Sequence, residues 1–189
     1  MKIGVLALQG AFREHRQTLE RCGVEAVEIR KPEELADIEG LIIPGGESTT
    51  MGKLMVEWEL MERIKARAAT GMAIYGTCAG MIVLAKEIVG SDQPRLGLMD
   101  IAVQRNAFGR QRESFEADLF VPEFGEQPLR AVFIRAPYIE RVGAEVKVMA
   151  AVDDKAVIAR QGKLLVTSFH PELTNDDRIH KYFLSMIRE

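Results

Sequence analysis

Cys78 occupies a position that suits nucleophilic catalysis. It lies at the centre of the pattern Gly-x-Cys-x-Gly at residues 76–80, between a short apolar run and a helical one. This is the arrangement of a nucleophile elbow, in which a sharp strand-to-helix turn presents the reactive side chain. Free backbone N–H groups and the dipole at the start of a helix favour a thiolate there. The alternative is a cysteine that packs as a small apolar residue within the turn.

A base for such a thiol follows near the end of the sequence. His170 comes directly after the apolar run 164–169 and is followed by Pro171 and Glu172. Because Pro171 favours an extended His170, and residues two apart in an extended segment point the same way, Glu172 can accept a hydrogen bond from one ring nitrogen. The other nitrogen can then take a proton from a thiol, which supports acyl transfer through a thioester. The alternative is a loop histidine whose hydrogen bonds serve only the fold.

The other two histidines lack this placement. His15 and His180 lie in helical patterns among charged residues, and we expect both to face solvent. We expect no metal site, because one cysteine, one histidine and one glutamate at these spacings match no closed zinc pattern.

A glycine-rich loop offers hydrogen-bond donors for the same reaction. Residues 44–50 read Pro-Gly-Gly-Glu-Ser-Thr-Thr, and the pair Gly45 and Gly46 leaves backbone N–H groups accessible. We expect one of the three hydroxyl residues to cap the helix that follows, which should run to about residue 69. The loop lacks the Gly-Lys-Ser/Thr ending of a phosphate loop. The alternative is an ordinary connection between a strand and a helix.

The elements that must position these residues alternate between strands and helices. In the first half, strands are expected at 3–8, 24–29, 41–43 and before residue 76, and helices at 12–22, 32–38, 48–69 and 81–86. This order predicts an α/β fold with a mostly parallel sheet and right-handed crossovers. Because the carboxyl ends of parallel strands lie at one edge of a sheet, Gly46, Cys78 and His170 should meet there.

The second half should add antiparallel strands to this sheet. Strands are expected at 98–103, 113–121, 129–134, 146–152, 156–160 and 164–169, before a helix over 176–187 capped by Thr174 or Asn175. The sequence contains no internal repeat or linker, so we expect residues 1–189 to form a single domain.

Composition narrows the function classes. Of the 189 residues, 47% are hydrophobic and 28% charged, and the net charge is −3. These values are ordinary for a globular protein and do not recommend nucleic acid or an anionic membrane as a partner. The two cysteines lie in different units, which predicts no disulfide framework and fits a cytoplasmic protein. No apolar segment has the length of a signal-peptide core or a membrane span.

Several stretches together carry a family resemblance that covers the chain. They are residues 4–10 (GVLALQG), 44–50 (PGGESTT), 76–80 (GTCAG), 104–111 (QRNAFGRQ), 133–137 (FIRAP) and 169–174 (FHPELT). With them the chain resembles the class I, triad-type glutamine amidotransferases, and within that class the glutaminase subunits of pyridoxal 5′-phosphate synthase. The resemblance implies a flavodoxin-like, three-layer αβα sandwich with a mostly parallel, mixed central sheet.

The resemblance also implies a catalytic role for each motif residue. Cys78 would attack the side-chain amide of L-glutamine, His170 would take the thiol proton and pass it to the leaving ammonia, and Glu172 would orient His170. The backbone N–H groups of Gly46 and Ala79 would form the oxyanion hole.

Substrate and partner contacts follow from the same resemblance. The glutamine would be held by Gly46, Glu47, Ser48, Arg105, Ile134 and Arg135. A planar arginine fork suits an α-carboxylate, although an arginine seen alone is usually a surface residue. The ammonia would pass to the pyridoxal 5′-phosphate synthase subunit in a heteromeric complex, with Gln9 and Gly10 in the docking surface. This chain would carry no cofactor of its own.

Three other interpretations remain open from the sequence. Another ammonia-supplying glutaminase, such as that of imidazole glycerol phosphate synthase, shares the triad but fits residues 8–10 and 46–49 less well. A regulatory or scaffold domain on the same fold would release no ammonia even with its partner. A thiol peptidase or stress-type hydrolase usually places its histidine soon after the nucleophile, whereas here His170 comes late.

Overall fold

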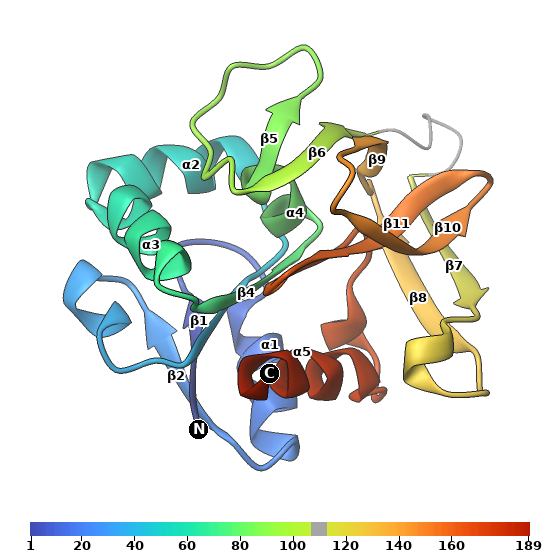
Figure 1. The fold of residues 1–189 in the computed structure, drawn as a ribbon, viewed down its shortest axis with the longest axis horizontal. Coiled ribbons are helices and arrows are strands. Elements are labelled where there is room, and N and C mark those ends of the chain that lie inside the picture. Colours follow the sequence, from blue (N-terminus) through green and yellow to red (C-terminus); the bar gives the residue numbers. More distant parts are fainter. Residues whose placement is uncertain (107–112) are drawn as a thin grey trace.

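A mixed β-sheet forms the centre of the structure. The computed structural model describes residues 1–106 and 113–189, in which ten strands share one sheet in the order β2-β1-β3-β4-β12-β11-β9-β6-β5, with β10 paired to β11 (Figure 1). The first five strands in this order run parallel: β2 (Glu25–Ile29), β1 (Lys2–Leu6), β3 (Gly40–Ile43), β4 (Ala73–Thr77) and β12 (Leu164–Thr167). The other five are β11 (Lys155–Gln161), β9 (Tyr138–Val142), β6 (Met99–Gln104), β5 (Ala85–Ile88) and β10 (Lys147–Val152). Strands β7 (Ser114–Leu119) and β8 (Leu129–Ile134) form a separate antiparallel pair.

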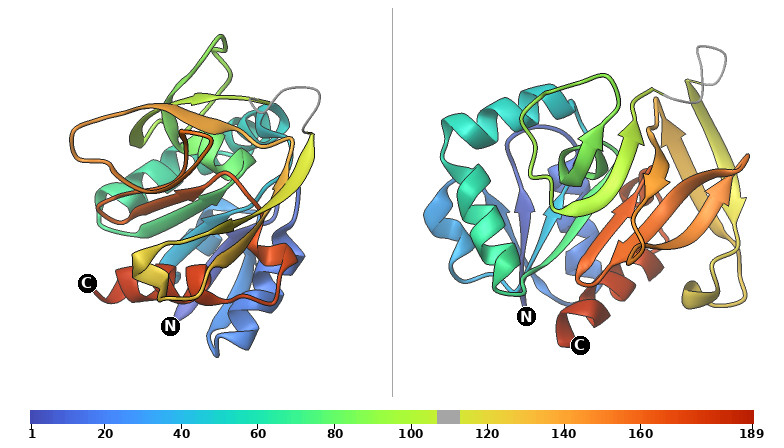
Figure 2. Two further views of the ribbon diagram at one scale, coloured as in Figure 1. Left: turned by 90° about the vertical axis from the view of Figure 1, so that its right-hand side faces the viewer. Right: turned by 45° about the horizontal axis from the view of Figure 1, so that its top comes forward.

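Helices cover both faces of the parallel half (Figures 1 and 2). On one face lie α1 (Phe12–Arg21) and α5 (Arg178–Arg188), and on the other α2 (Ser48–Glu57), α3 (Leu60–Ala69) and α4 (Ala79–Leu84). Short 3₁₀ turns lie at η1 (Pro32–Leu35), η2 (Pro122–Phe124) and η3 (Pro171–Leu173). The predicted three-layer α/β architecture with a mixed central sheet is confirmed.

Two hydrophobic cores result from the alternation of side chains along each strand. In β3, Leu41 and Ile43 join the core under α2 to α4, whereas Ile42 joins the core under α1 and α5. The second core takes Leu19 from α1 and Phe183 from α5. Because both faces are covered, these strands are apolar throughout, which is the pattern that the sequence shows.

Several of the predicted helices have different boundaries in the structure. The short helix expected over 32–38 is only the 3₁₀ turn η1. The single helix expected over 48–69 is divided into α2 and α3, because Glu59 adopts a left-handed conformation with φ of 57°. The helix expected over 81–86 begins at Ala79 and ends at Leu84, after which Ala85 is extended. The carbonyl of Val83 accepts a hydrogen bond from Leu96 N at 2.7 Å, so a distant segment satisfies the helix end.

The pairing of strands in the second half of the chain also differs from the prediction. Strands β5 and β9 were not predicted, and β7 and β8 pair with each other outside the main sheet. Strand β12 is antiparallel to β11 but parallel to β4, so it joins the two halves. Local sequence does not specify these distant partners.

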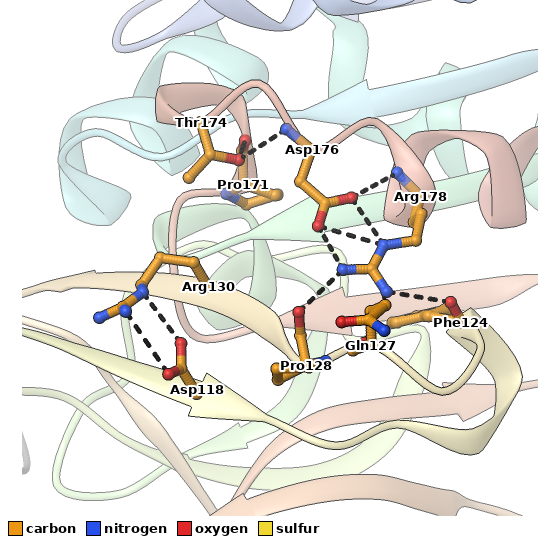
Figure 3. A network of polar contacts seen from close by, with 9 residues as sticks. All are labelled: Asp118, Phe124, Gln127, Pro128, Arg130, Pro171, Thr174, Asp176 and Arg178. Carbon is orange, nitrogen blue, oxygen red and sulfur yellow. Dashed lines mark hydrogen bonds and ion pairs between the residues drawn. The ribbon is translucent and has the colours of Figure 1, made fainter.

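The start of α5 is set by Arg178 rather than by the predicted cap. The helix begins at Arg178 instead of Asp176, and neither Thr174 nor Asn175 caps it, because Asp177 is the cap residue and makes no side-chain cap bond. The Asp176 carboxylate accepts from Arg178 N at 3.1 Å and pairs with its guanidinium (Figure 3). That guanidinium also donates to the carbonyl oxygens of Phe124 (3.1 Å), Gln127 (2.7 Å) and Pro128 (3.0 Å). This network fixes the chain directly after residues 170–174.

Candidate active site

The carboxyl ends of three parallel strands lie side by side. Ile43 of β3 is level with Gly76 of β4, and Thr77 of β4 is level with Thr167 of β12. The loops that carry Gly46, Cys78 and His170 therefore leave the sheet at one edge, which is where the sequence places them.

Cys78 occupies a strained turn between β4 and α4. Its φ of 49° and ψ of −103° are unusual for a residue with a side chain, and it is almost fully buried. Its N–H donates to Thr167 O at 2.8 Å, and its carbonyl accepts from Ile82 N at 3.2 Å. A Cβ on Gly80 would lie 2.1 Å from the carbonyl oxygen of Ile43, so this close approach requires the glycine. The surrounding sheet and helix thus hold the elbow in place.

His170 and Glu172 form a buried pair beside this thiol. The Nδ1 of His170 lies 2.7 Å from Glu172 Oε1, and the His170 N–H donates to Val132 O at 2.9 Å. Both residues are buried. Gly45 packs against both reactive groups, because a Cβ there would lie 2.4 Å from His170 Cε1 and 3.4 Å from Cys78 Cβ.

The charges of this cluster are set by short contacts in a buried place. Burial by itself would lower the pKa of His170, but hydrogen bonds with Cys78 and Glu172, and their negative charge, raise it to about 10. Burial would raise the pKa of Glu172, but its electrostatic interaction with His15 and the hydrogen bond from His170 bring it below its ordinary value. The arrangement therefore keeps a proton on His170 and a negative charge on Glu172.

The glycine loop is held by residues 9–11. The Glu47 N–H donates to Gln9 Oε1 at 2.6 Å, and the Ala11 N–H donates to Gly45 O at 3.1 Å. A Cβ on Gly10 would lie 1.8 Å from that same carbonyl oxygen, and Gly10 has a φ of 92°. The loop after β1 and the loop after β3 thus pack as one unit at the edge of the sheet.

The cap of α2 differs from the prediction. The carboxylate of Glu47, rather than a hydroxyl of the residues after it, accepts from Thr49 N at 3.3 Å and Thr50 N at 2.7 Å. Burial would raise the pKa of Glu47, but these hydrogen bonds lower it. The Glu47 side chain is therefore used for capping.

These loops surround a cavity of about 460 Å³. Apart from Glu172, which lies behind His170, every residue that the sequence singles out lines it. The lining is Gln9, Gly10, Ala11, Gly45, Gly46, Glu47, Ser48, Cys78, Ala79, Ile82, Arg105, Asn106, Ile134, Arg135, His170 and Leu173. Ala79 is the first residue of α4, so its N–H belongs to the first turn, where the N–H groups have no acceptor within the helix.

Two arginines, Arg105 and Arg135, also line the cavity. Arg105 Nη1 donates to Gln93 Oε1 at 2.9 Å and lies 3.4 Å from Thr49 Oγ1. Arg135 follows Ile134 in a turn with φ of 44°, and its N–H donates to Glu113 O at 2.5 Å. Residues 107–111 of the motif at 104–111 lie outside the described residues.

The sequence interpretation of His15 and His180 is wrong. Both side chains are fully buried, with His15 Nε2 3.4 Å from Glu172 Oε2. A signal for this burial was present, since His15 lies four residues before Leu19 and His180 three before Phe183, on the apolar stripes of α1 and α5. Ala11, Ile82, Asn106 and Leu173 also line the cavity without having been singled out.

Within 1–106 and 113–189, no three or more His, Cys, Asp or Glu residues are arranged to hold a metal ion. In the same residues no helix combines the length and the apolar character that crossing a bilayer requires. A second cavity, of about 480 Å³, is lined by Pro32, Val56, Glu59, Met61, Glu62 and Arg63. That lining brings neither a thiol nor an imidazole, so the cavity at Cys78 is the candidate active site.

Comparison with known proteins adds independent evidence. The model of the SNO glutamine amidotransferase family matches residues 5–189. The chain is 64% identical over 188 residues to a pyridoxal 5′-phosphate synthase subunit PdxT of Desulforamulus reducens, covering 100% of both chains. The protein of the same name from Moorella thermoacetica is 62% identical over 187 residues, which is 99% of this chain and 100% of that one.

Solved structures agree with this family match. One described as a glutamine amidotransferase superposes with a TM-score of 0.94 at 54% identity, covering 99% of each chain. The PurLQS structure from Thermotoga maritima reaches a TM-score of 0.71 at 18% identity over 97% of each chain, which shows a shared fold.

Proposed function

Because this chain belongs to the SNO glutamine amidotransferase family, we propose that it hydrolyses L-glutamine to L-glutamate and ammonia through a thioester on Cys78. We further propose that the ammonia passes to a synthase subunit that builds pyridoxal 5′-phosphate. The observation that carries the first proposal is the buried cluster in which His170 hydrogen-bonds Glu172 and lies beside the Cys78 thiol, at the wall of a cavity of about 460 Å³.

Formation of the thioester begins with the thiol proton on His170, whose raised pKa of about 10 keeps it there. The Cys78 sulfur forms a bond to the side-chain amide carbon of glutamine as the C=O double bond opens. The carbonyl oxygen becomes an oxyanion that accepts hydrogen bonds from the N–H groups of Gly46 and Ala79. His170 then donates its proton to the amide nitrogen, the C–N bond breaks, and ammonia leaves.

Hydrolysis repeats these steps with water as the nucleophile. His170 takes a proton from water, the hydroxide oxygen bonds to the thioester carbon, and the same two N–H groups hold the oxyanion. The C–S bond then breaks, the sulfur recovers the proton from His170, and glutamate leaves. A raised pKa of about 10 suits His170 to keep its proton until the leaving group needs it.

Recognition of glutamine is assigned to the rest of the cavity wall. We assign the α-carboxylate to the arginines, Arg105 and Arg135, because a guanidinium binds a carboxylate with two parallel hydrogen bonds. We assign the remaining contacts to Gly46, Glu47, Ser48 and Ile134, all of which line the cavity.

The partner proposal rests on the names of the relatives, which are subunits of pyridoxal 5′-phosphate synthase. Residues 1–189 would act as one glutaminase domain in a heteromeric complex in the cytoplasm, without a cofactor of their own. We place Gln9 and Gly10 in the docking surface, because they line the cavity, are half-buried and exposed respectively, and contact the loop at residues 45–47. Replacing both should reduce the stimulation of glutaminase activity by the synthase subunit; unchanged stimulation would contradict this placement.

The experiment that tests the reaction is an assay of glutamate release with and without the synthase subunit. Wild-type protein should release glutamate, and Cys78→Ala should release none while keeping its circular dichroism spectrum and melting temperature. Glutamate release that survives Cys78→Ala would rule out the thioester. No release from the wild type, even with the partner present, would favour a scaffold domain on this fold.

A further inference from the structure

A row of buried polar side chains continues the triad away from the cavity. His180 Nε2 on α5 lies 2.9 Å from His15 Nδ1 on α1. His15 Nε2 lies 3.1 Å from Thr77 Oγ1 at the end of β4, and 3.4 Å from Glu172 Oε2. The side chains of His180, His15 and Thr77 are fully buried, and none of these three residues lines the cavity. The proposed reaction does not use them.

Burial disfavours a positive charge on both histidines of this row. Burial lowers the pKa of His15, although the charges of Glu172 and Glu14 oppose it and that of His170 assists it. Burial also brings the pKa of His180 well below its ordinary value, assisted by His15 and Arg21. A neutral imidazole carries one N–H donor and one bare acceptor nitrogen, so the row has a direction.

The direction of the hydrogen bonds along this row follows from Nδ1 of His180, at the end of the row away from Glu172. Within the described residues, His180 Nδ1 is buried and has no hydrogen-bond partner. A buried N–H without a partner is rarer than an acceptor without one, so the His180 proton belongs on Nε2. It then donates to His15 Nδ1, which leaves the His15 proton on Nε2, facing Thr77 and Glu172.

We propose that His15 is a positioning residue for the glutaminase reaction, whose Nε2–H stabilises Oε2 of Glu172 while His170 uses Oε1, and that His180 fixes the tautomer of His15. The inference rests on the proposed function, in which Glu172 orients His170. Oε2 of Glu172 is buried and makes no hydrogen bond within the described residues. A buried carboxylate needs positive charge or donors on both oxygens, and His15 Nε2 is the ring nitrogen aimed at this one.

A purely structural role is the competing explanation. His15 and His180 also pack against Tyr75, with ring centroids 6.3 Å and 5.9 Å away, and join α1 and α5 to the sheet. Such a role predicts that every substitution lowers activity only as far as it lowers stability. The positioning role instead depends on one N–H at one place.

Two matched substitutions separate these roles. In His15→Gln the amide nitrogen reaches about as far as Nε2, whereas in His15→Asn it reaches only as far as Nδ1. Assayed in the complex with the synthase subunit, His15→Asn should lose about tenfold or more in kcat with KM changed by less than about twofold, and His15→Gln should recover most of that loss.

The pH profile supplies a second readout. Without the Nε2–H, the pKa of Glu172 rises, so the acidic limb of kcat against pH should move up by about one unit in His15→Asn. Equal losses in the two variants that follow their melting temperatures, with no movement of that limb, would overturn the positioning role.

The tautomers can be read without the reaction. In the resting protein labelled with ¹⁵N-histidine, NMR at about pH 7.5 should show both His15 and His180 as neutral Nε2–H tautomers. An Nδ1–H tautomer, or a positively charged ring of either residue at that pH, would overturn the assignment. Failure of the proposed function would show differently, as absence of glutamate release from the wild-type complex.

Discussion

The two sides of the cavity are built by different kinds of structure. The reaction side, Cys78 and His170 with Glu172 behind them, leaves the ends of adjacent parallel strands and is buried. The recognition side, Arg105, Ile134 and Arg135, follows β6 and β8, and its side chains are half-buried or exposed. Strand register leaves the reaction side almost no freedom, whereas the recognition side depends on loops and on a few side-chain contacts.

This difference predicts how each side responds to substitution. On the reaction side, backbone and side chains approach one another so closely that even a small added side chain should abolish activity. On the recognition side, each group contributes part of the binding energy, so losses should be graded and should appear mainly in KM.

Gly45→Ala should have the largest effect. The added Cβ would lie 2.4 Å from His170 Cε1 and 3.0 Å from its Nδ1, so the imidazole must move away from the thiol. We expect glutaminase activity to fall to background in the stimulated assay, because misplacement of this size removes general acid–base catalysis worth about 10²–10⁴-fold and misaligns the nucleophile.

Gly71→Ala is the matched control for this substitution. A Cβ there meets nothing within 4 Å, and only its φ of 93° is unfavourable. It should cost about 1 kcal/mol of stability and leave kcat/KM unchanged. If Gly45→Ala kept wild-type activity, the close packing of the reaction side would have no functional meaning.

Glu172→Gln should have the next largest effect. The amide keeps the shape but removes the charge that orients His170 and helps to raise its pKa. We expect kcat to fall by about 10²–10⁴-fold with a smaller change in KM, measured as glutamate release against pH. A loss below about tenfold would show that His170 is oriented by other contacts.

Arg105→Lys tests the recognition side. Lysine keeps the charge but not the planar fork, and the contact of Arg105 Nη1 with Gln93 Oε1 shows that this fork is held in place. A lost charge-assisted hydrogen bond of about 1.5–3 kcal/mol should raise KM for glutamine by about 10–100-fold with little change in kcat. Arg63→Lys, in the second cavity, should leave both constants unchanged. A fall in kcat without a rise in KM would move Arg105 to the reaction side.

The sequence predicted the reaction side better than its surroundings. A Gly-x-Cys-x-Gly turn and a His-Pro-Glu segment each carry their local geometry, and parallel pairing then brings both to one edge. The partners of β5, β7 and β8 depend on contacts between distant segments that local patterns do not contain. The cap at Glu47 was missed because its carboxylate reaches the N–H groups that a hydroxyl residue was expected to satisfy. The start of α5 was missed because Arg178 bonds to carbonyl oxygens of residues 124, 127 and 128, which are far away in the sequence.

Buried histidines were missed for a different reason. Charged neighbours around His15 and His180 suggested exposure, but only the face of a helix decides burial, and both lie on the faces that pack against the sheet. Their hydrogen bonds cross from α1 to α5 and to Thr77, residues that are far apart in the sequence.

The pH dependence of stability should reveal the reaction side without substrate. Because the folded pKa of His170 is raised from 6.5 to about 10, its charge stabilises the fold fully below about pH 6.5, and this stabilisation is lost as pH rises to about 10. Urea unfolding of wild type and His170→Asn at several pH values should therefore show a stability difference that shrinks by up to about 1.4 kcal/mol per pH unit in that window. A constant difference would contradict the raised pKa. Glu172 has the opposite sign, since its lowered pKa gives stability that is lost as pH falls.

Cys22→Ala should have the smallest effect, because Cys22 lies outside the cavity and serves as a comparison for Cys78. Cys22 ends α1 and is half-buried, and burial together with the charge of Asp177 raises the pKa of its thiol, so it stays protonated at neutral pH. It lacks the elbow, the histidine and the N–H groups that surround Cys78. We expect kcat/KM within about twofold of wild type, and peptide mapping after brief iodoacetamide treatment should find Cys78 alkylated well before Cys22. Faster alkylation of Cys22 would mean that exposure, rather than the buried contacts of the reaction side, governs thiol reactivity in this protein.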